Sequence, residues 1–166
     1  VALSVIPCED EAGHAYSPAL VATDGESIAA AYGNNVYVYE KKNGAFALSY
    51  ACRPNNVIAG ISCVYGKCYF VTKGFGYGAA SADFSQEQVC VRDDVSQEHP
   101  PAALTSDLYG NLYVVRTDGK VYKYTESNFT DKAAAPLGEA LEITLPADFR
   151  SVHADFEGNL YCLSEN

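Results

Sequence analysis

Residues 107–124 read Asp-Leu-Tyr-Gly-Asn-Leu-Tyr-Val-Val-Arg-Thr-Asp-Gly-Lys-Val-Tyr-Lys-Tyr, and residues 155–161 repeat their start as Asp-Phe-Glu-Gly-Asn-Leu-Tyr. The plan is a short strand, a glycine-containing turn and an aliphatic-aromatic strand, and it recurs in four segments: 27–37, 61–69, 104–113 and 152–161. The tyrosines that anchor them (Tyr37, Tyr69, Tyr113 and Tyr161) follow at intervals of 32, 44 and 48 residues. Periods of about 40 to 50 residues are typical of propeller blades.

The strands after these turns do not alternate between polar and apolar residues. Residues 36–39, 68–71, 112–115 and 160–163 are apolar at every position. Because a strand with one face in water would alternate, both faces of these strands must be covered, and no segment between them indicates a strong amphipathic helix. We therefore predict an all-β fold, a β-propeller of about four blades or part of a larger one. The alternative is a β-sandwich.

The blade at residues 107–124, with the partial copy at 155–161, resembles the repeats of the NHL, YVTN and two-component-regulator propeller superfamily. The resemblance implies the fold more than a function, since that superfamily includes binding scaffolds, sensors and a few lyases. We expect one unit over residues 1–166, with blades at about 26–58, 59–101, 102–146 and 147–166. In this interpretation residues 1–24 supply the outer strands of the last blade.

The turns of these repeats have a local explanation. Asp107 and Asp155 stand three residues before Gly110 and Gly158, the order of a type I turn followed by a left-handed glycine. We interpret both aspartates as structural acceptors inside the turn. The second repeat carries Cys63 at this position, and Cys68 follows the turn, so a disulfide between them is predicted to hold it instead.

Composition limits the classes of function. The 166 residues carry a formal net charge of −10, which argues against nucleic acid as a partner, and no apolar run is long enough to predict a membrane span. Six cysteines and an Asn-Phe-Thr glycosylation pattern at Asn128 favour a secreted or cell-surface protein. The alternative is that the cysteines are reduced and serve as small core residues. No motif for a metal or another cofactor is predicted.

The predicted binding face consists of the loops that enter each first strand and the loops between second and third strands. It combines positive charge, amides and aromatic rings, which suits a protein or glycan ligand; ordinary solvated loops are the alternative. Ten residues form the candidate site: Arg53, Asn55, Asn56, Lys73, Phe75, Tyr77, His99, Asp118, Arg150 and His153.

Three functions remain open from the sequence. The first is a non-enzymatic, extracytoplasmic binding module, with no catalytic residue assigned. The second is a small lyase-like enzyme that uses His153 or His99 for proton transfer. The third is a structural segment that completes a propeller together with another chain.

Overall fold

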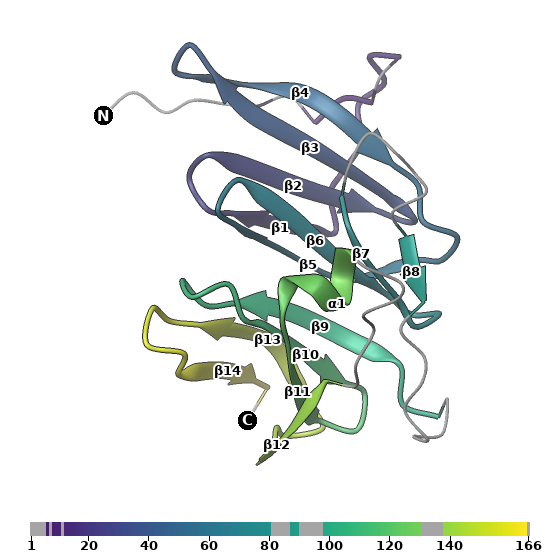
Figure 1. Cartoon of the computed structure of the whole chain (residues 1–166). Helices are drawn as coiled ribbons and strands as arrows, with labels where there is room; N and C mark the ends of the chain where they lie inside the picture. The colour runs from purple at the N-terminus through teal and green to yellow at the C-terminus, as the bar shows by residue number, and fades with distance from the viewer. Residues whose placement is uncertain are drawn as a thin grey trace.

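The computed structural model describes residues 6, 8–10, 12–80, 87–89, 98–130 and 138–165. These residues form fourteen strands and one short helix, arranged in four antiparallel sheets (Figure 1). The prediction of an all-β fold is therefore confirmed.

Three of the sheets have four strands and the last has two. The first sheet contains β1 (Leu20–Thr23), β2 (Ser27–Tyr32), β3 (Asn35–Lys42) and β4 (Ala45–Cys52). The second contains β5 (Ile58–Val64), β6 (Lys67–Thr72), β7 (Gly76–Ala79) and β8 (Glu87–Val89). The third contains β9 (Pro101–Ser106), β10 (Leu112–Arg116), β11 (Lys120–Tyr124) and β12 (Glu139–Thr144), with α1 (Glu126–Thr130) between its last two strands. The fourth pairs β13 (Phe149–Ala154) with β14 (Leu160–Ser164).

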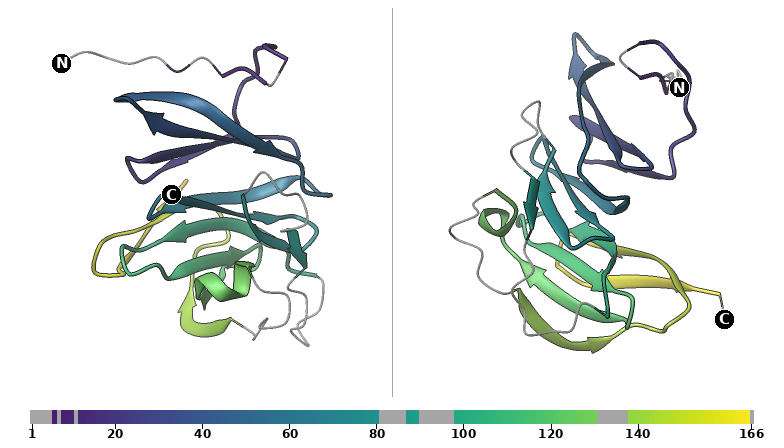
Figure 2. Two further views of the ribbon diagram at one scale, coloured as in Figure 1. Left: turned by 45° about the horizontal axis from the view of Figure 1, so that its top comes forward. Right: turned by 90° about the vertical axis from the view of Figure 1, so that its right-hand side faces the viewer.

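Each sheet packs against the next one in the chain, and the sheets fan out from their first strands (Figure 2). Polar contacts join these first strands directly. The Ser62 and Ser106 hydroxyl oxygens lie 2.7 Å apart, and the Ala154 amide donates to Thr105 Oγ1 at 3.1 Å. Four sheets whose first strands lie next to one another form a propeller-like arrangement rather than a two-sheet sandwich. The described residues form an arc, and no closed barrel is found.

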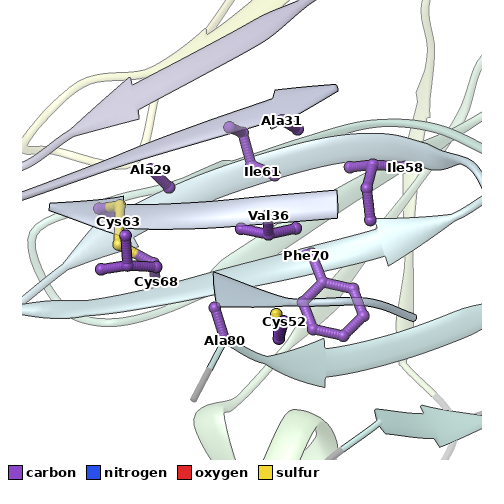
Figure 3. Packing of buried hydrophobic residues seen from close by; sticks show 11 residues of the cluster. Ala29, Ala31, Val36, Cys52, Ile58, Ile61, Cys63, Cys68, Phe70 and Ala80 are labelled. Atoms are coloured by element: carbon purple, nitrogen blue, oxygen red, sulfur yellow. A yellow bond between two sulfur atoms is a disulfide. The ribbon is translucent and has the colours of Figure 1, made fainter. Parts of the chain in front are cut away.

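The core consists of the layers between consecutive sheets. Between the first two sheets, Ala29, Ala31 and Val36 meet Ile61 and Phe70 (Figure 3). Small side chains on β2 let the two backbones approach, and the Phe70 ring fills the space beside them. The cluster between the second and third sheets includes Tyr69, Val71, Leu112, Val114 and Phe129, and the cluster between the third and fourth includes Tyr113, Val115, Val152 and Leu160.

The prediction that these apolar strands are covered on both faces is confirmed for residues 36–39 of β3 and for β6 and β10. Tyr113 is 5% exposed and Val115 is fully buried. The prediction is wrong for β14, where the side chains of Tyr161 and Leu163 are 60% and 63% exposed. Within the described residues, no sheet packs on that side of β14.

The first sheet begins one strand earlier than the repeat suggested. Residues 20–23 pair with β2 across a short turn at Asp24 and Gly25, so residue 26 is not the start of the blade. Ala29 therefore occupies the position of Tyr69 and Tyr113, and Tyr37 belongs to the third strand. Residues 20–23 therefore do not supply an outer strand of the fourth blade, contrary to the expectation for this part of residues 1–24.

The segment before β1 covers the outer face of the first sheet. The Tyr16 ring stacks on Tyr37 at 4.4 Å between centroids, and the two hydroxyl oxygens of Tyr16 and Tyr39 lie 2.8 Å apart. Ile6 packs into the same cluster. The part of the N-terminal segment at residues 1–5, 7 and 11 lies outside the described residues.

Candidate functional site

A cavity of about 750 Å³ lies along the inner side of the arc. The first strands β1, β5, β9 and β13 form its wall, together with the turns that follow them. Its polar lining includes Asp24, Glu26, Ser62, Thr105 and His153. A cavity of this size, lined by the first strands of the four sheets, is large enough for a small molecule or for a few residues of a peptide.

The turns that follow the first strands lie side by side at one end of this cavity. Asp24 Oδ2 accepts the Gly66 amide at 2.5 Å, and Ser27 Oγ donates to the Gly66 carbonyl at 3.1 Å. The Tyr65 ring lies against Gly110, where an added Cβ would be 3.5 Å from it. Contacts between neighbouring turns therefore fix their relative positions.

The Asp107 carboxylate holds the third turn together, as predicted. Oδ1 accepts the amides of Tyr109 and Asn111 at 2.8 and 3.0 Å, and Oδ2 accepts Asn111 Nδ2 at 2.7 Å and the Tyr113 hydroxyl at 2.9 Å. Burial opposes ionisation, but the side-chain donors of Asn111 and Tyr113 and the two amides outweigh it and lower the pKa of Asp107. Burial and the bond to Asp107 raise the pKa of Tyr113 to about 12.

Asp155 repeats this network in the fourth turn. It accepts the amides of Glu157 and Asn159 at 2.9 Å, Asn159 Nδ2 at 2.9 Å and the Tyr161 hydroxyl at 3.0 Å. The Asn159 side chain makes the largest contribution to lowering the pKa of Asp155, although this turn is exposed to solvent. Because all four acceptor positions of each carboxylate are used, both aspartates serve as turn scaffolds.

Large apolar side chains stand at the tips of these turns. We define the turn rim as Tyr65, Leu108, Tyr109 and Phe156, whose exposed fractions lie between 60% and 72%. Each stands in the turn between the first and second strands of its sheet. Tyr65 has a positive φ of 54°, which places it at the tip of a two-residue hairpin turn with Gly66. Acidic side chains accompany the rim, with Glu26 and Glu157 exposed.

Most of the predicted site residues lie at the opposite ends of the strands. Arg53, Asn55 and Asn56 connect β4 to β5, Lys73 and Phe75 form the β6–β7 turn, Asp118 lies in the β10–β11 turn, and His99 precedes β9. The structure joins these loops in pairs. The Lys73 amide donates to the Val57 carbonyl at 2.9 Å, and the Thr117 amide donates to the Pro100 carbonyl at 3.0 Å.

Two members of the predicted site are placed elsewhere. Tyr77 is buried, because it lies within β7 on the side that faces the third sheet, 5.5 Å from the Phe129 ring. Its assignment as an exposed ligand-binding residue is wrong. His153 is the one member of the set that lines the cavity, and Arg150, at the start of β13, pairs with Glu165.

The structure supports one of the two predicted covalent modifications and contradicts the other. The Cys63–Cys68 disulfide is present, with the two Cα atoms 4.1 Å apart across the β5–β6 turn. Asn128 is 3% exposed, and its Oδ1 caps α1 by accepting the Thr125 amide at 2.9 Å and the Thr125 hydroxyl at 3.0 Å. Because a glycan needs an accessible amide nitrogen, this burial contradicts the prediction of glycosylation at Asn128.

The turn rim was not predicted from the sequence. The signal was present, since Tyr65 and Tyr109 each directly precede a turn glycine, where a side chain tends to point into solvent. Within the described part of the chain, no three histidine, cysteine or acidic side chains form a metal-binding group. In the same residues, no helix has both the length and the apolar character needed to cross a membrane.

Comparison with known proteins supports the fold. No family model matches the chain, and no curated protein matches its sequence. Among 236 matching solved chains, one from a crystal structure of the mitotic checkpoint complex aligns over 86% of this chain with a TM-score of 0.57 and 12% sequence identity. The aligned part is 44% of that chain, so this protein spans less than half of its length. The likeness shows a propeller-like fold and leaves the narrower resemblance to NHL or YVTN repeats without support from a family model.

Proposed function

We propose that this protein is a non-enzymatic binding module that holds a segment of another protein against the turn rim and the adjoining cavity. The observation that carries the proposal is the turn rim itself, a set of exposed apolar side chains on turns whose positions are fixed by contacts with one another. Exposed aromatic side chains on a rigid support are typical of protein-binding surfaces, because they bury a large area with little loss of entropy.

Charge indicates the kind of segment. The chain carries a net charge of −10, and Glu26 and Glu157 flank the turn rim. A ligand with lysine or arginine residues would be attracted by this field, and its cations could lie over the Tyr65 and Tyr109 rings. The same negative charge argues against nucleic acid as the partner.

The remaining parts of the proposal concern compartment and chemistry. The Cys63–Cys68 disulfide supports an extracytoplasmic location, because such bonds persist in oxidising compartments. His153 lines the cavity, whereas His99 lies in the loop before β9, at the other end of the strands. The alternative of a lyase-like enzyme that uses His153 or His99 for proton transfer is tested by His153→Ala and His99→Ala in a substrate screen.

A selection experiment tests the binding function. The full chain is screened against a displayed library of random peptides and, separately, against a glycan array. We expect peptides rich in lysine or arginine to bind. The triple variant Tyr65→Ser, Tyr109→Ser, Phe156→Ser should weaken that binding by about thirtyfold or more, because a single interface aromatic at such a position is worth about 2 kcal/mol.

The matched control changes the loops at the opposite ends of the strands. The double variant Arg53→Ser, Lys73→Ser also alters exposed residues and should leave peptide binding unchanged. Binding that depends on Arg53 and Lys73 would move the site to those loops. Glycan binding that depends on the turn rim would replace the protein ligand with a carbohydrate, and the absence of binders in both screens would contradict the proposal.

A further inference from the structure

Two hairpin turns of this protein have nearly the same backbone but differ in their first residue. Asn43 and Gly44 join β3 to β4, and Tyr65 and Gly66 join β5 to β6. The φ angles are 52° and 81° in the first of these turns and 54° and 74° in the second. Both residues of such a turn need a left-handed backbone, which asparagine and glycine tolerate and a bulky side chain does not. The β3–β4 turn therefore has the residue that its backbone favours, whereas the β5–β6 turn has a tyrosine there.

Packing of the tyrosine ring does not explain this choice. Tyr65 is 69% exposed, so little apolar area is buried to offset the strained backbone. The ring lies against Gly110, where an added Cβ would be 3.5 Å from it, but most of its surface faces solvent. Phe75 also has a positive φ, of 63°, yet it is partly buried. Tyr65 thus combines an unfavourable backbone with an exposed aromatic ring.

Contacts from outside the turn hold Tyr65 in this conformation. The Cys63–Cys68 disulfide joins the two strands next to the turn. From the first sheet, Asp24 Oδ2 accepts the Gly66 amide at 2.5 Å. A strained backbone persists where its surroundings impose it, and such positions gather at functional sites. The fold therefore keeps an aromatic ring at this tip at the expense of stability.

The location of the ring suits a contact with a ligand. Tyr65 belongs to the turn rim and also lines the cavity, as do Asp24 and Glu26 of the first turn and Leu108 of the third. The ring therefore stands between an acidic turn and an apolar one. A lysine or arginine side chain that lies over the ring would also face the carboxylates of the first turn.

We propose that Tyr65 is the residue of the turn rim on which ligand recognition depends, and that the fold retains it against its own stability. The inference rests on the proposed function, because it takes the ligand to be a basic peptide segment. It adds which rim residue determines the affinity. The other rim residues, Leu108, Tyr109 and Phe156, do not have a positive φ, so their presence at the tips needs no such explanation.

Replacing Tyr65 by asparagine separates recognition from stability. In Tyr65→Asn the β5–β6 turn acquires the Asn-Gly sequence of the β3–β4 turn. We expect the melting temperature to rise by about 2 to 4 °C, because the backbone strain is relieved. The same variant should bind a basic peptide selected on the unmodified chain about thirtyfold more weakly, as expected when a dominant interface aromatic is lost. A loss of binding in a more stable variant cannot result from unfolding.

The matched control makes the reverse exchange in the other turn. Asn43→Tyr places a tyrosine on the same backbone away from the turn rim. It should lower the melting temperature by a similar amount and leave peptide binding unchanged. Tyr65→Phe keeps the ring, so it should retain both the affinity and the melting temperature of the unmodified chain.

The possible outcomes distinguish this inference from the proposed function. An unchanged or lower melting temperature of Tyr65→Asn would show that the ring serves the fold, and would overturn the inference whether or not a peptide binds. Unchanged peptide binding by Tyr65→Asn would also overturn it, while the proposed function would stand with Tyr109 and Phe156 as its contacts. If the library yields no peptide for the unmodified chain, the proposed function and this role of Tyr65 both fail.

Discussion

The third and fourth sheets carry nearly the same motif in two different environments. Asp107 and Tyr113 bond at 2.9 Å within the core, and Asp155 and Tyr161 bond at 3.0 Å in solvent. The turn therefore forms from its own residues, whether or not a neighbouring sheet covers it. What the neighbour adds is burial, so the same side chains should contribute very different amounts to stability.

The largest expected difference is between Tyr113→Ala and Tyr161→Ala. Removing the buried Tyr113 ring leaves a void between the third and fourth sheets and should cost about 3 to 5 kcal/mol in the free energy of unfolding. Tyr161 is largely exposed, so its removal should change stability by about 0.5 kcal/mol or less. Urea unfolding measured by circular dichroism gives both values. Equal losses would show that the fourth sheet is covered in solution.

The aspartates give the next comparison. Asp107→Asn replaces one acceptor oxygen by an amide donor that faces other donors. We expect the free energy of unfolding to fall by about 2 to 3 kcal/mol, because hydrogen bonds to a charged group are strong. Asp155→Asn should have a smaller effect, since water can satisfy its turn.

The stabilisation from Asp107 should depend on pH. Its pKa is lowered in the folded protein, so this contribution is present at neutral pH and is lost as the pH falls through the ordinary value and then through the folded one. Thermal unfolding from pH 7 down to pH 3 should therefore show a shallower decline for Asp107→Asn than for the unmodified chain. Parallel curves would contradict the role assigned to this carboxylate.

The second turn has a disulfide where the third has a carboxylate. Replacing Cys63 and Cys68 by alanine together should cost about 2 kcal/mol, as expected for a loop this short when the unfolded chain is no longer restrained. Asp24 of the first turn still accepts the Gly66 amide, so the hairpin should keep its structure. The melting temperature with and without reductant measures this effect, and an unfolded variant would show that the disulfide is essential.

Local features could be predicted from the sequence, and features that depend on neighbouring sheets could not. The Asp107 and Asp155 turns and the Cys63–Cys68 bond are set within a few residues, and all three are confirmed. The start of the first sheet was predicted wrongly because its turn at Asp24 is one residue shorter than the turns at Asp107 and Asp155. Its second strand also carries Ala29 where the other sheets have tyrosine.

The site residues show the same division. The glycines around Tyr77 predict an exposed loop, but Tyr77 is buried by the third sheet and by Phe129. Asn128 matches a glycosylation pattern, but its side chain caps a helix that packs beside β7. The turn rim was missed because three turns from separate repeats come together only when the sheets stack.

The smallest expected effect concerns the glycine between the two compared turns. Gly158 has a φ of 84°, and an added Cβ would lie 3.3 Å from the Tyr113 hydroxyl oxygen. We expect Gly158→Ala to cost about 1 kcal/mol, because an L-residue is strained in this region. Gly158→Asn keeps a Cβ but tolerates the left-handed backbone, so it separates the two causes. If asparagine restores stability, backbone strain dominates. If it does not, close packing on the Tyr113 hydroxyl requires the glycine.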